Sequence, residues 1–390
     1  MRICPVNDLE DDMVLGKSIY QLNGKLLLGA GFRINAQMKE KLLERGYTHI
    51  YIKEEGTEDV VPEEIVSDMI SLQAKAQLAS KIYDIQNRTE FKNASVSKAA
   101  YLLESGYLKD VSLSYDMKKI IEEILKDITS AGSQLLNSVM IKTADTYFLD
   151  HALNVTILSI LIGRTYRFSH KELLSLGLGS FLHDIGKVVI EQMNESKDPK
   201  KAKKLYTEHP TFGYLMLNNM PNISPLETQI VNQHHENQDG LGFPSRLKGE
   251  NLPPKKSVDR VTKGHIYRLA EICSVANTFD NLAYNPQDKE KHDPVSAIKQ
   301  IILDAGTKYN KDVVKTFLKV VPYYPVGATI KIVDIVDTAL IGYVGVVAKL
   351  HRDNINNPVI ILTKNRYMKQ IKPIIIDTLK TPKVLLKLVL

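Results

Sequence analysis

The chain of 390 residues has the composition of an ordinary globular protein, with 44% hydrophobic and 25% charged residues, which excludes a disordered or fibrous chain. Its length allows two or three domains and at least one full hydrophobic core. The net charge of +6 is mild, so we expect no nucleic-acid polymer as a partner, although this charge suits a phosphate-bearing substrate.

The cysteines and the apolar runs indicate a compartment. Cys4 and Cys273 are the only cysteines, they lie far apart and they match no metal-binding spacing, so the sequence excludes a disulfide framework and favours a reducing environment. No apolar run approaches the ~18 residues that a membrane span needs, and no apolar signal core follows Met1. We therefore expect a cytoplasmic protein without a membrane span.

Residues 1–60 predict a small α+β unit. Two apolar runs, at residues 18–22 and 25–28, flank Asn23-Gly24, which indicates a hairpin with a two-residue turn because both turn positions must tolerate positive φ. The next predicted elements are a helix from Met38 to Arg45, ended by Gly46, and a strand over residues 49–52.

Residues 61–144 read as a polar helical linker or dimerisation region that packs on a partner or on the next domain. Residues 145–320 are predicted to be helical and hold most of the histidines that carry chemistry. Residues 321–390 change character and predict an antiparallel barrel or sheet of about five strands. Its Val/Ile-rich runs are 329–336, 342–349, 358–363 and 371–377.

The adjacent pair His183-Asp184 lies in an apolar stretch that is predicted to be helical. Burying either side chain costs several kcal/mol unless it is paired or binds a metal. The pair alone has two interpretations, a hydrogen bond at a helix end or a metal site. A carboxylate such as Asp184 can also bridge two ions.

Other histidines favour the metal site. His151 lies on the apolar face of a predicted helix, where a histidine alone is more often a satisfied core residue. His209 begins another predicted helix, where an ordinary surface histidine is the alternative. His234-His235 ends a helix before a glycine-rich turn, a position that can deliver two neutral imidazoles to adjacent metals. Together these elements predict a metal centre.

In order and approximate spacing, these elements resemble the HD-GYP domain of the HD superfamily, over roughly residues 140–320. The resemblance implies a mainly α fold, in which an HD-superfamily helical bundle carries the small N-terminal α+β unit and the C-terminal small β barrel or sheet. The matching residues are His151, His183-Asp184, Gly186-Lys187, His209, His234-His235-Glu236, Asp239-Gly240 and Gly242-Phe243-Pro244.

The family hydrolyses the bacterial second messenger cyclic di-GMP to pGpG and GMP, and its cofactors are two, sometimes three, iron or manganese ions. By resemblance, Asp184 bridges the metals and Lys187 holds a phosphate oxygen as a point charge. His151 and His183 serve one side of the site, whereas His209, His234 and His235 serve the other. Asp239 and Phe243 are the corresponding substrate-binding positions. The carboxylate of a third metal site would fall at Tyr147, so we expect two divalent metal ions, Fe or Mn.

Three departures from the family pattern bear on activity. Asn277 stands where the family has its last aspartate ligand, and an amide oxygen can coordinate a metal but brings no charge. Asp280, one turn later, is a conceivable substitute. The arginine of an Arg-Pro-Tyr-Lys-like stretch is absent, which leaves Lys289 as the remaining basic candidate for substrate phosphate. Finally, Phe243 replaces the tyrosine of Gly-Tyr-Pro.

The chain also has an additional segment of basic residues, 253–265. This segment is either a solvated loop or a lid.

Two functions from different classes follow. The first is a two-metal phosphodiesterase acting on cyclic di-GMP. The second is a degenerate, weakly active or inactive HD-GYP protein that binds the dinucleotide or a partner in signalling. Another HD-type nucleotide phosphohydrolase fits the tandem histidines less well. We also expect a homodimer and a signalling protein as a partner of the flanking units.

Overall fold

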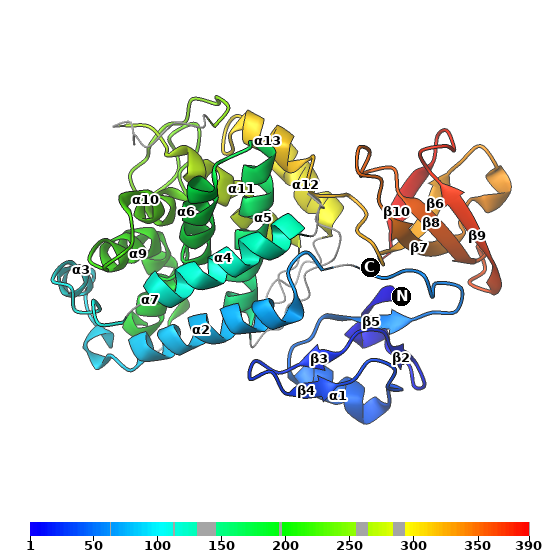
Figure 1. Ribbon diagram of the computed structural model, residues 1–390, viewed down its shortest axis with the longest axis horizontal. Coiled ribbons are helices and arrows are strands. Elements are labelled where there is room, and N and C mark those ends of the chain that lie inside the picture. Colours follow the sequence, from blue (N-terminus) through cyan, green and yellow to red (C-terminus); the bar gives the residue numbers. More distant parts are fainter. Residues whose placement is uncertain are drawn as a thin grey trace.

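The computed structural model describes the chain except residues 63, 112–113, 131–145, 195–196, 255–263, 284–292 and 390. A large helical body lies beside two smaller units, one from each end of the sequence (Figure 1). The fold is therefore mainly α with additional sheets, as the sequence predicts. None of the described helices is long and apolar enough to cross a membrane.

The N-terminal unit is α+β, as predicted. Its three-stranded sheet has the order β1-β5-β2, with both pairs antiparallel, and α1 ends where Gly46 takes a positive φ of 71°. Its elements are β1 (Arg2–Pro5), β2 (Val14–Leu15), β3 (Ile19–Tyr20), β4 (Leu26–Leu28), α1 (Ala36–Glu44) and β5 (His49–Lys53).

The hairpin β3-β4 forms, but the predicted two-residue turn is wrong. Gly24 donates a backbone hydrogen bond to Gln21 and has φ of 77°, whereas Asn23 is not among the residues with positive φ. Gln21 in turn pairs with Lys25, so the loop contains three residues. The Asn23 side chain accepts a hydrogen bond from the Lys25 amide at 3.0 Å, which holds Asn23 in an ordinary conformation.

Twelve helices build the helical body within the described residues. Several begin at a polar cap, as at Ser169, whose side chain forms a capping box with Glu172. The helices are α2 (Asp68–Gln86), α3 (Val96–Glu104), α4 (Ser114–Ser130), α5 (Tyr147–Thr165), α6 (His170–Phe181), α7 (Lys187–Met193), α8 (Pro199–Leu205), α9 (His209–Asn218), α10 (Pro225–Gln233), α11 (Arg268–Ala283), α12 (Pro294–Leu303) and α13 (Lys311–Phe317).

Helix α5 is the central element of the body. Residues 149–163 are all buried, because α6 and α11 pack against this helix and α2 lies against it as well. The sequence pattern predicts one inward face, but the helix is enclosed on every side over this stretch. A helix buried all round places its polar residues where they need partners or a metal.

Helices α2, α3 and α4 share one apolar core with the helices that follow, within the part of the chain that the structure describes. Leu78 of α2, Leu103 of α3 and Ile124 of α4 belong to the same apolar cluster as Val155 of α5. These helices therefore pack on the helices that follow, which is one of the two arrangements the sequence suggests. The predicted domain boundaries themselves stay a prediction.

The C-terminal unit is an open antiparallel sheet with the order β10-β6-β7-β8-β9. Its strands are β6 (Thr329–Asp334), β7 (Val344–Lys349), β8 (Val359–Lys364), β9 (Gln370–Asp377) and β10 (Leu385–Leu388). This unit contacts the N-terminal unit, since the Ile3 amide donates to the Gly327 carbonyl at 2.8 Å and Lys364 pairs with Glu54 at 3.1 Å. The two ends of the chain thus meet on one side of the helical body (Figure 1).

Candidate metal centre

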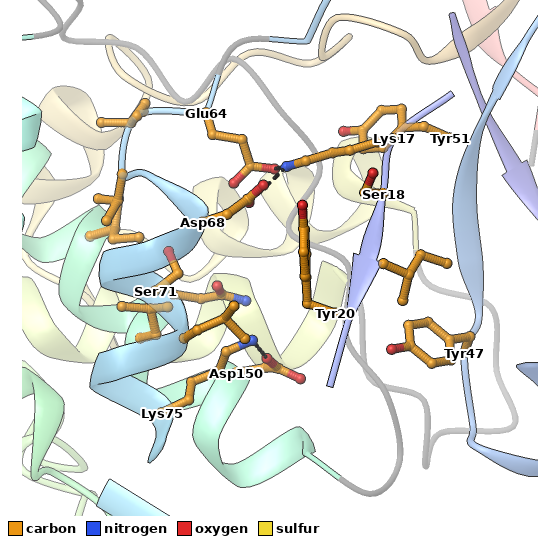
Figure 2. Close-up of a pocket in the computed structure, with 17 residues that line it drawn as sticks. Lys17, Ser18, Tyr20, Tyr47, Tyr51, Glu64, Asp68, Ser71, Lys75 and Asp150 are labelled. Atoms are coloured by element: carbon orange, nitrogen blue, oxygen red, sulfur yellow. Dashed lines mark hydrogen bonds and ion pairs between the residues drawn. The ribbon is translucent and has the colours of Figure 1, made fainter. Parts of the chain in front are cut away.

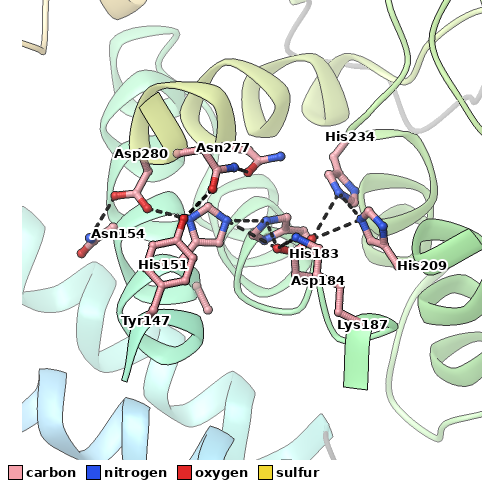
Figure 3. A network of polar contacts seen from close by, with 12 residues as sticks. Tyr147, His151, Asn154, His183, Asp184, Lys187, His209, His234, Asn277 and Asp280 are labelled. Carbon is pink, nitrogen blue, oxygen red and sulfur yellow. Dashed lines mark hydrogen bonds and ion pairs between the residues drawn. The ribbon is translucent and has the colours of Figure 1, made fainter. Parts of the chain in front are cut away.

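The predicted ligands converge in the middle of the helical body (Figure 3). His151 comes from α5, His209 is the first residue of α9, and His234 caps the C-terminus of α10. These three residues, His183 and Asp184 are all at most 3% exposed. His209 is therefore no surface histidine, and the cluster needs hydrogen bonds, metals or both to balance the loss of solvation.

His183 and Asp184 lie in a turn, and the helical environment predicted for them is wrong. Helix α6 ends at Phe181 and α7 begins at Lys187, so the pair occupies the connection between them. A Cβ added to Gly186 would lie 2.1 Å from the His209 carbonyl oxygen. The missing side chain at Gly186 therefore lets this turn press against the start of α9, which brings Asp184 to His209.

Asp184 directs its two oxygens to different groups of histidines. Its Oδ2 lies 3.5 Å from His151 Nε2 and 3.4 Å from His183 Nε2. Its Oδ1 lies 3.2 Å from His209 Nε2 and 3.7 Å from His234 Nε2. Oδ1 is also buried without a hydrogen-bond partner. A carboxylate in this position can bridge two cations.

The hydrogen bonds of the imidazoles fix their tautomers. The Nδ1 atoms of three histidines lie 2.6–2.7 Å from backbone carbonyl oxygens, which only accept, so each Nδ1 carries the hydrogen and each Nε2 presents a lone pair. These pairs are His183 with Ser180, His209 with Tyr206, and His234 with Val231.

The resulting lone pairs face each other. The Nε2 atoms of His151 and His183 are 3.2 Å apart, and so are the Nε2 atoms of His209 and His234. Two facing lone pairs repel unless a cation or a proton lies between them. The donor set therefore fits one divalent metal ion on each side of Asp184.

The centre divides into two halves that share Asp184. The four-donor half consists of Asp184, His209, His234 and His235. The three-donor half consists of His151, His183 and Asp184. Within each half the ligand atoms all lie within 4.8 Å of one another, which is compatible with coordination of one ion.

The electrostatics of the four-donor half favour neutral imidazoles and an ionised carboxylate. Burial lowers the pKa of His234 to about 3 and holds the pKa of His235 well below its usual range. Burial alone would raise the pKa of Asp184, but His183 and Lys187 hold it far below its ordinary value. Metals are bound by ligands in these states.

The residues around His151 form a polar chain that the sequence left unassigned. Asp280 accepts from His151 Nδ1 at 2.6 Å and from Asn154 Nδ2 at 3.0 Å, so both of its oxygens are in use (Figure 3). Asp280 thus orients His151 instead of taking the place of Asn277. Burial lowers the pKa of His151, but its hydrogen bonds to Asp184 and Asp280 raise it above the ordinary value.

Asn277 is 3% exposed and its amide oxygen already has a partner. It accepts a hydrogen bond from Asn281 Nδ2 at 2.6 Å, and Asn281 Oδ1 accepts from the Tyr147 hydroxyl at 2.7 Å. Sequence reasoning missed Asn281 and Asn154. Their helical spacings, four residues after Asn277 and three after His151, are the signal that could have found them.

Lys187 lies beside the bridging carboxylate. Its Nζ is 2.6 Å from Asp184 Oδ2. Burial lowers the pKa of Lys187, but the charge and hydrogen bond of Asp184, together with Tyr206 and Glu191, raise it above its ordinary value. The side chain is 26% exposed, so Lys187 lies on the more accessible side of the centre.

Phe243 and Asp239 occupy the turn after His235. The Phe243 ring stacks on His235 with centroids 4.6 Å apart and planes 18° from parallel. Asp239 is exposed and accepts a hydrogen bond from the Leu241 amide at 2.8 Å, within its own turn. Lys289 and residues 255–263 of the basic segment lie outside the described residues.

A concavity of about 190 Å³ lies between the N-terminal unit and helices α2 and α5 (Figure 2). Lys17 pairs there with Glu64 and, at 3.1 Å, with Asp68, and Lys75 pairs with Asp150 at 3.0 Å. Asn154 lines this concavity and also donates to Asp280. The N-terminal unit therefore lies near the residues that support His151.

Comparisons with known proteins agree with this geometry. Residues 120–313 match a family model described as HD domain. The chain is 26% identical over 244 residues to cyclic di-GMP phosphodiesterase PA4108 of Pseudomonas aeruginosa, covering 61% of this chain and 53% of that protein. It is 25% identical over 274 residues to a cyclic di-GMP phosphodiesterase of Thermotoga maritima, covering 68% of this chain and 66% of that protein.

The chain thus spans about half to two thirds of the length of these relatives. Among solved structures, it is similar to Bd1817, an HD-G"Y"P protein of Bdellovibrio bacteriovorus, with a TM-score of 0.39 and 18% identity. That similarity covers 81% of this chain and 97% of the other.

Proposed function

We propose that this chain, which is similar to HD-GYP proteins of the HD-domain family, is a metal-dependent phosphodiesterase that hydrolyses cyclic di-GMP to pGpG and GMP. The observation that carries the proposal is the position of Asp184, whose two oxygens face two separate pairs of imidazole nitrogens. The relatives named for cyclic di-GMP hydrolysis support the choice of substrate.

Two divalent ions bound in these halves would supply charge neutralisation at the phosphate and a water nucleophile at neutral pH. The chain's own residues would hold and orient the metal ligands and the substrate phosphate. The backbone carbonyls of Ser180, Tyr206 and Val231 keep three imidazoles in the metal-binding tautomer. Lys187 is placed to bind a non-bridging phosphate oxygen once it turns from Asp184.

The nature of the metals and the wider assembly are part of the proposal. We propose Fe or Mn as the native ions, because imidazole and carboxylate donors suit both. Asp239, Phe243 and Lys289 are proposed to contact the dinucleotide. A cytoplasmic homodimer, with the flanking units receiving a signal from a protein partner, completes the proposal.

A second function, binding without turnover, is favoured by Asn277. The amide brings no charge to the three-donor half, and its oxygen is held by Asn281. Such a centre could bind cyclic di-GMP through the four-donor half and Lys187 but hydrolyse it slowly. The two functions differ in turnover and not in recognition.

One experiment separates them. The protein is purified anaerobically, its Fe and Mn are quantified, and the conversion of cyclic di-GMP and of 3′3′-cGAMP is followed by chromatography. Two metals per chain with formation of pGpG or GMP supports the phosphodiesterase. Full metal occupancy without turnover, together with dinucleotide binding by calorimetry, would overturn it in favour of the binding function.

A further inference from the structure

Tyr206 lies directly against the metal centre, although no sequence motif singles it out. It begins the short 3-10 helix Tyr206–Glu208 before α9, and its carbonyl oxygen accepts from His209 Nδ1 at 2.6 Å. Its hydroxyl is 3.5 Å from His235 Nε2, and Lys187 Nζ lies 5.5 Å from its ring centroid. The ring position is therefore tied to the residues that hold metal and phosphate.

The more exposed residues of the metal centre lie next to Tyr206. His209 and His234 are at most 1% exposed, whereas His235 is only partly buried, and Lys187 is 26% exposed. Tyr206 contacts both of these more accessible residues and is itself 42% exposed. Tyr206 therefore lies where the more exposed residues of the site adjoin the candidate metal ligands.

Three neighbouring aromatic rings do not stack on the Tyr206 ring, and Lys187 Nζ lies over one of its faces. The rings of His209, His235 and Phe243 meet it at interplanar angles of 55–64°, so none of these three neighbours lies parallel to it. Phe243 is itself stacked on His235, which fixes the rim of the site on the other side. An exposed aromatic face beside a phosphate-binding lysine suits a nucleotide, whose base and phosphate are neighbours.

We propose that Tyr206 is a substrate-binding residue that stacks a purine base of the cyclic dinucleotide while Lys187 and the metals hold the adjacent phosphate. This inference rests on the proposed function and assigns a binding residue to the base of the substrate, which the metals do not contact. Stacking requires the ring and not the hydroxyl, so Tyr206→Phe keeps the interaction and Tyr206→Leu removes it.

The test uses the full-length, metal-loaded protein and a cyclic dinucleotide that carries the fluorescent base 2-aminopurine. Binding to the wild type is expected to quench the fluorescence, because 2-aminopurine is quenched when it stacks on an aromatic ring. Tyr206→Phe is expected to keep the quenching. Tyr206→Leu is expected to lose it and to raise the Kd by about 5- to 150-fold, the range for one base–aromatic stack.

Steady-state kinetics distinguish a role of Tyr206 in substrate binding from a role in stabilising the fold. For Tyr206→Leu, KM for cyclic di-GMP should rise while kcat and metal content change little. Tyr367→Leu is the matched control, since Tyr367 is 76% exposed in the C-terminal unit and its loss should alter none of these values.

Several outcomes would overturn the inference. Quenching that survives in Tyr206→Leu would show that the base stacks elsewhere. Equal loss of activity in Tyr206→Phe and Tyr206→Leu would assign the effect to the hydroxyl near His235. Quenched binding without hydrolysis would contradict the proposed phosphodiesterase but keep Tyr206 as a base-binding residue, so the two failures are distinguishable.

Discussion

The two halves of the metal centre share one carboxylate but differ in what surrounds it. The four-donor half adds three imidazoles to Asp184, two of them held by backbone carbonyls of their own helix turns. The three-donor half adds two, and its further position is Asn277, a neutral amide that already accepts a hydrogen bond.

The two halves differ in the charge and the number of their donors more than in their geometry. In both halves the facing Nε2 atoms are 3.2 Å apart and a carboxylate oxygen lies within 3.7 Å of each. The arrangement of a two-metal site is thus retained where one ligand charge is missing. We infer that the four-donor half binds its ion more tightly.

The largest effect on metal content and turnover is expected at Asp184, because both halves share this carboxylate. Asp184→Asn removes the negative charge that both halves use, so metal content should fall from about two ions per chain toward zero and turnover should fall below detection. Elemental analysis of the purified protein measures this. Asp353→Asn, at an exposed position of the C-terminal unit, is the matched control and should keep both ions.

A pair of histidine substitutions tests the halves against each other. His183→Ala should leave about one ion per chain, because the four-donor half stays complete. His234→Ala should leave less than one ion at the same metal concentration, because only the weaker half is intact. Metal titration followed by calorimetry compares them, and equal losses in both variants would contradict unequal halves.

Asn277→Asp should reduce the difference in metal affinity between the two halves. An added carboxylate in the three-donor half is expected to raise the affinity for the second ion by about 10- to 100-fold, the scale on which residues that support a metal site act. Titration with Mn²⁺ monitored by electron paramagnetic resonance would show spin coupling at lower metal concentration. Asn218→Asp, exposed at the end of α9, adds the same charge elsewhere and should leave the titration unchanged.

The smallest expected effect is at Tyr147. Tyr147→Phe removes the hydrogen bond to Asn281, which supports Asn277, and should lower the free energy of unfolding by about 1 kcal/mol. Affinity for the second ion should fall by less than about 10-fold, since no ligand is lost. Urea denaturation and the same Mn²⁺ titration measure both, and Tyr101→Phe, on the exposed side of α3, is the control. A change confined to the four-donor half would contradict the assignment.

Much of the centre was predictable because its signals are local. His234 and His235 adjoin a helix end and a glycine-rich turn, and both features can be read within a few residues. The strands of the C-terminal sheet and the capping of α6 follow from the same short-range preferences. These features need no knowledge of distant parts of the chain.

Other features depended on contacts between distant segments. Helical periodicity alone could not place His183-Asp184 in a turn, because that turn is set by the packing of Gly186 against the start of α9. Nor could it tell that Asp280 would be used by His151, which lies 129 residues away in the sequence.

The sequence by itself therefore determined the candidate ligands and most of the helices that carry them, since side-chain chemistry and backbone preferences are local properties. Only the tertiary structure decided which oxygen of Asp184 meets which histidines, that the Tyr147 hydroxyl engages Asn281, and that Tyr206 lies at the solvent side. The reason is physical: these relations are distances of a few ångströms between residues far apart in the chain, and they exist only once α5, α9 and α11 pack together.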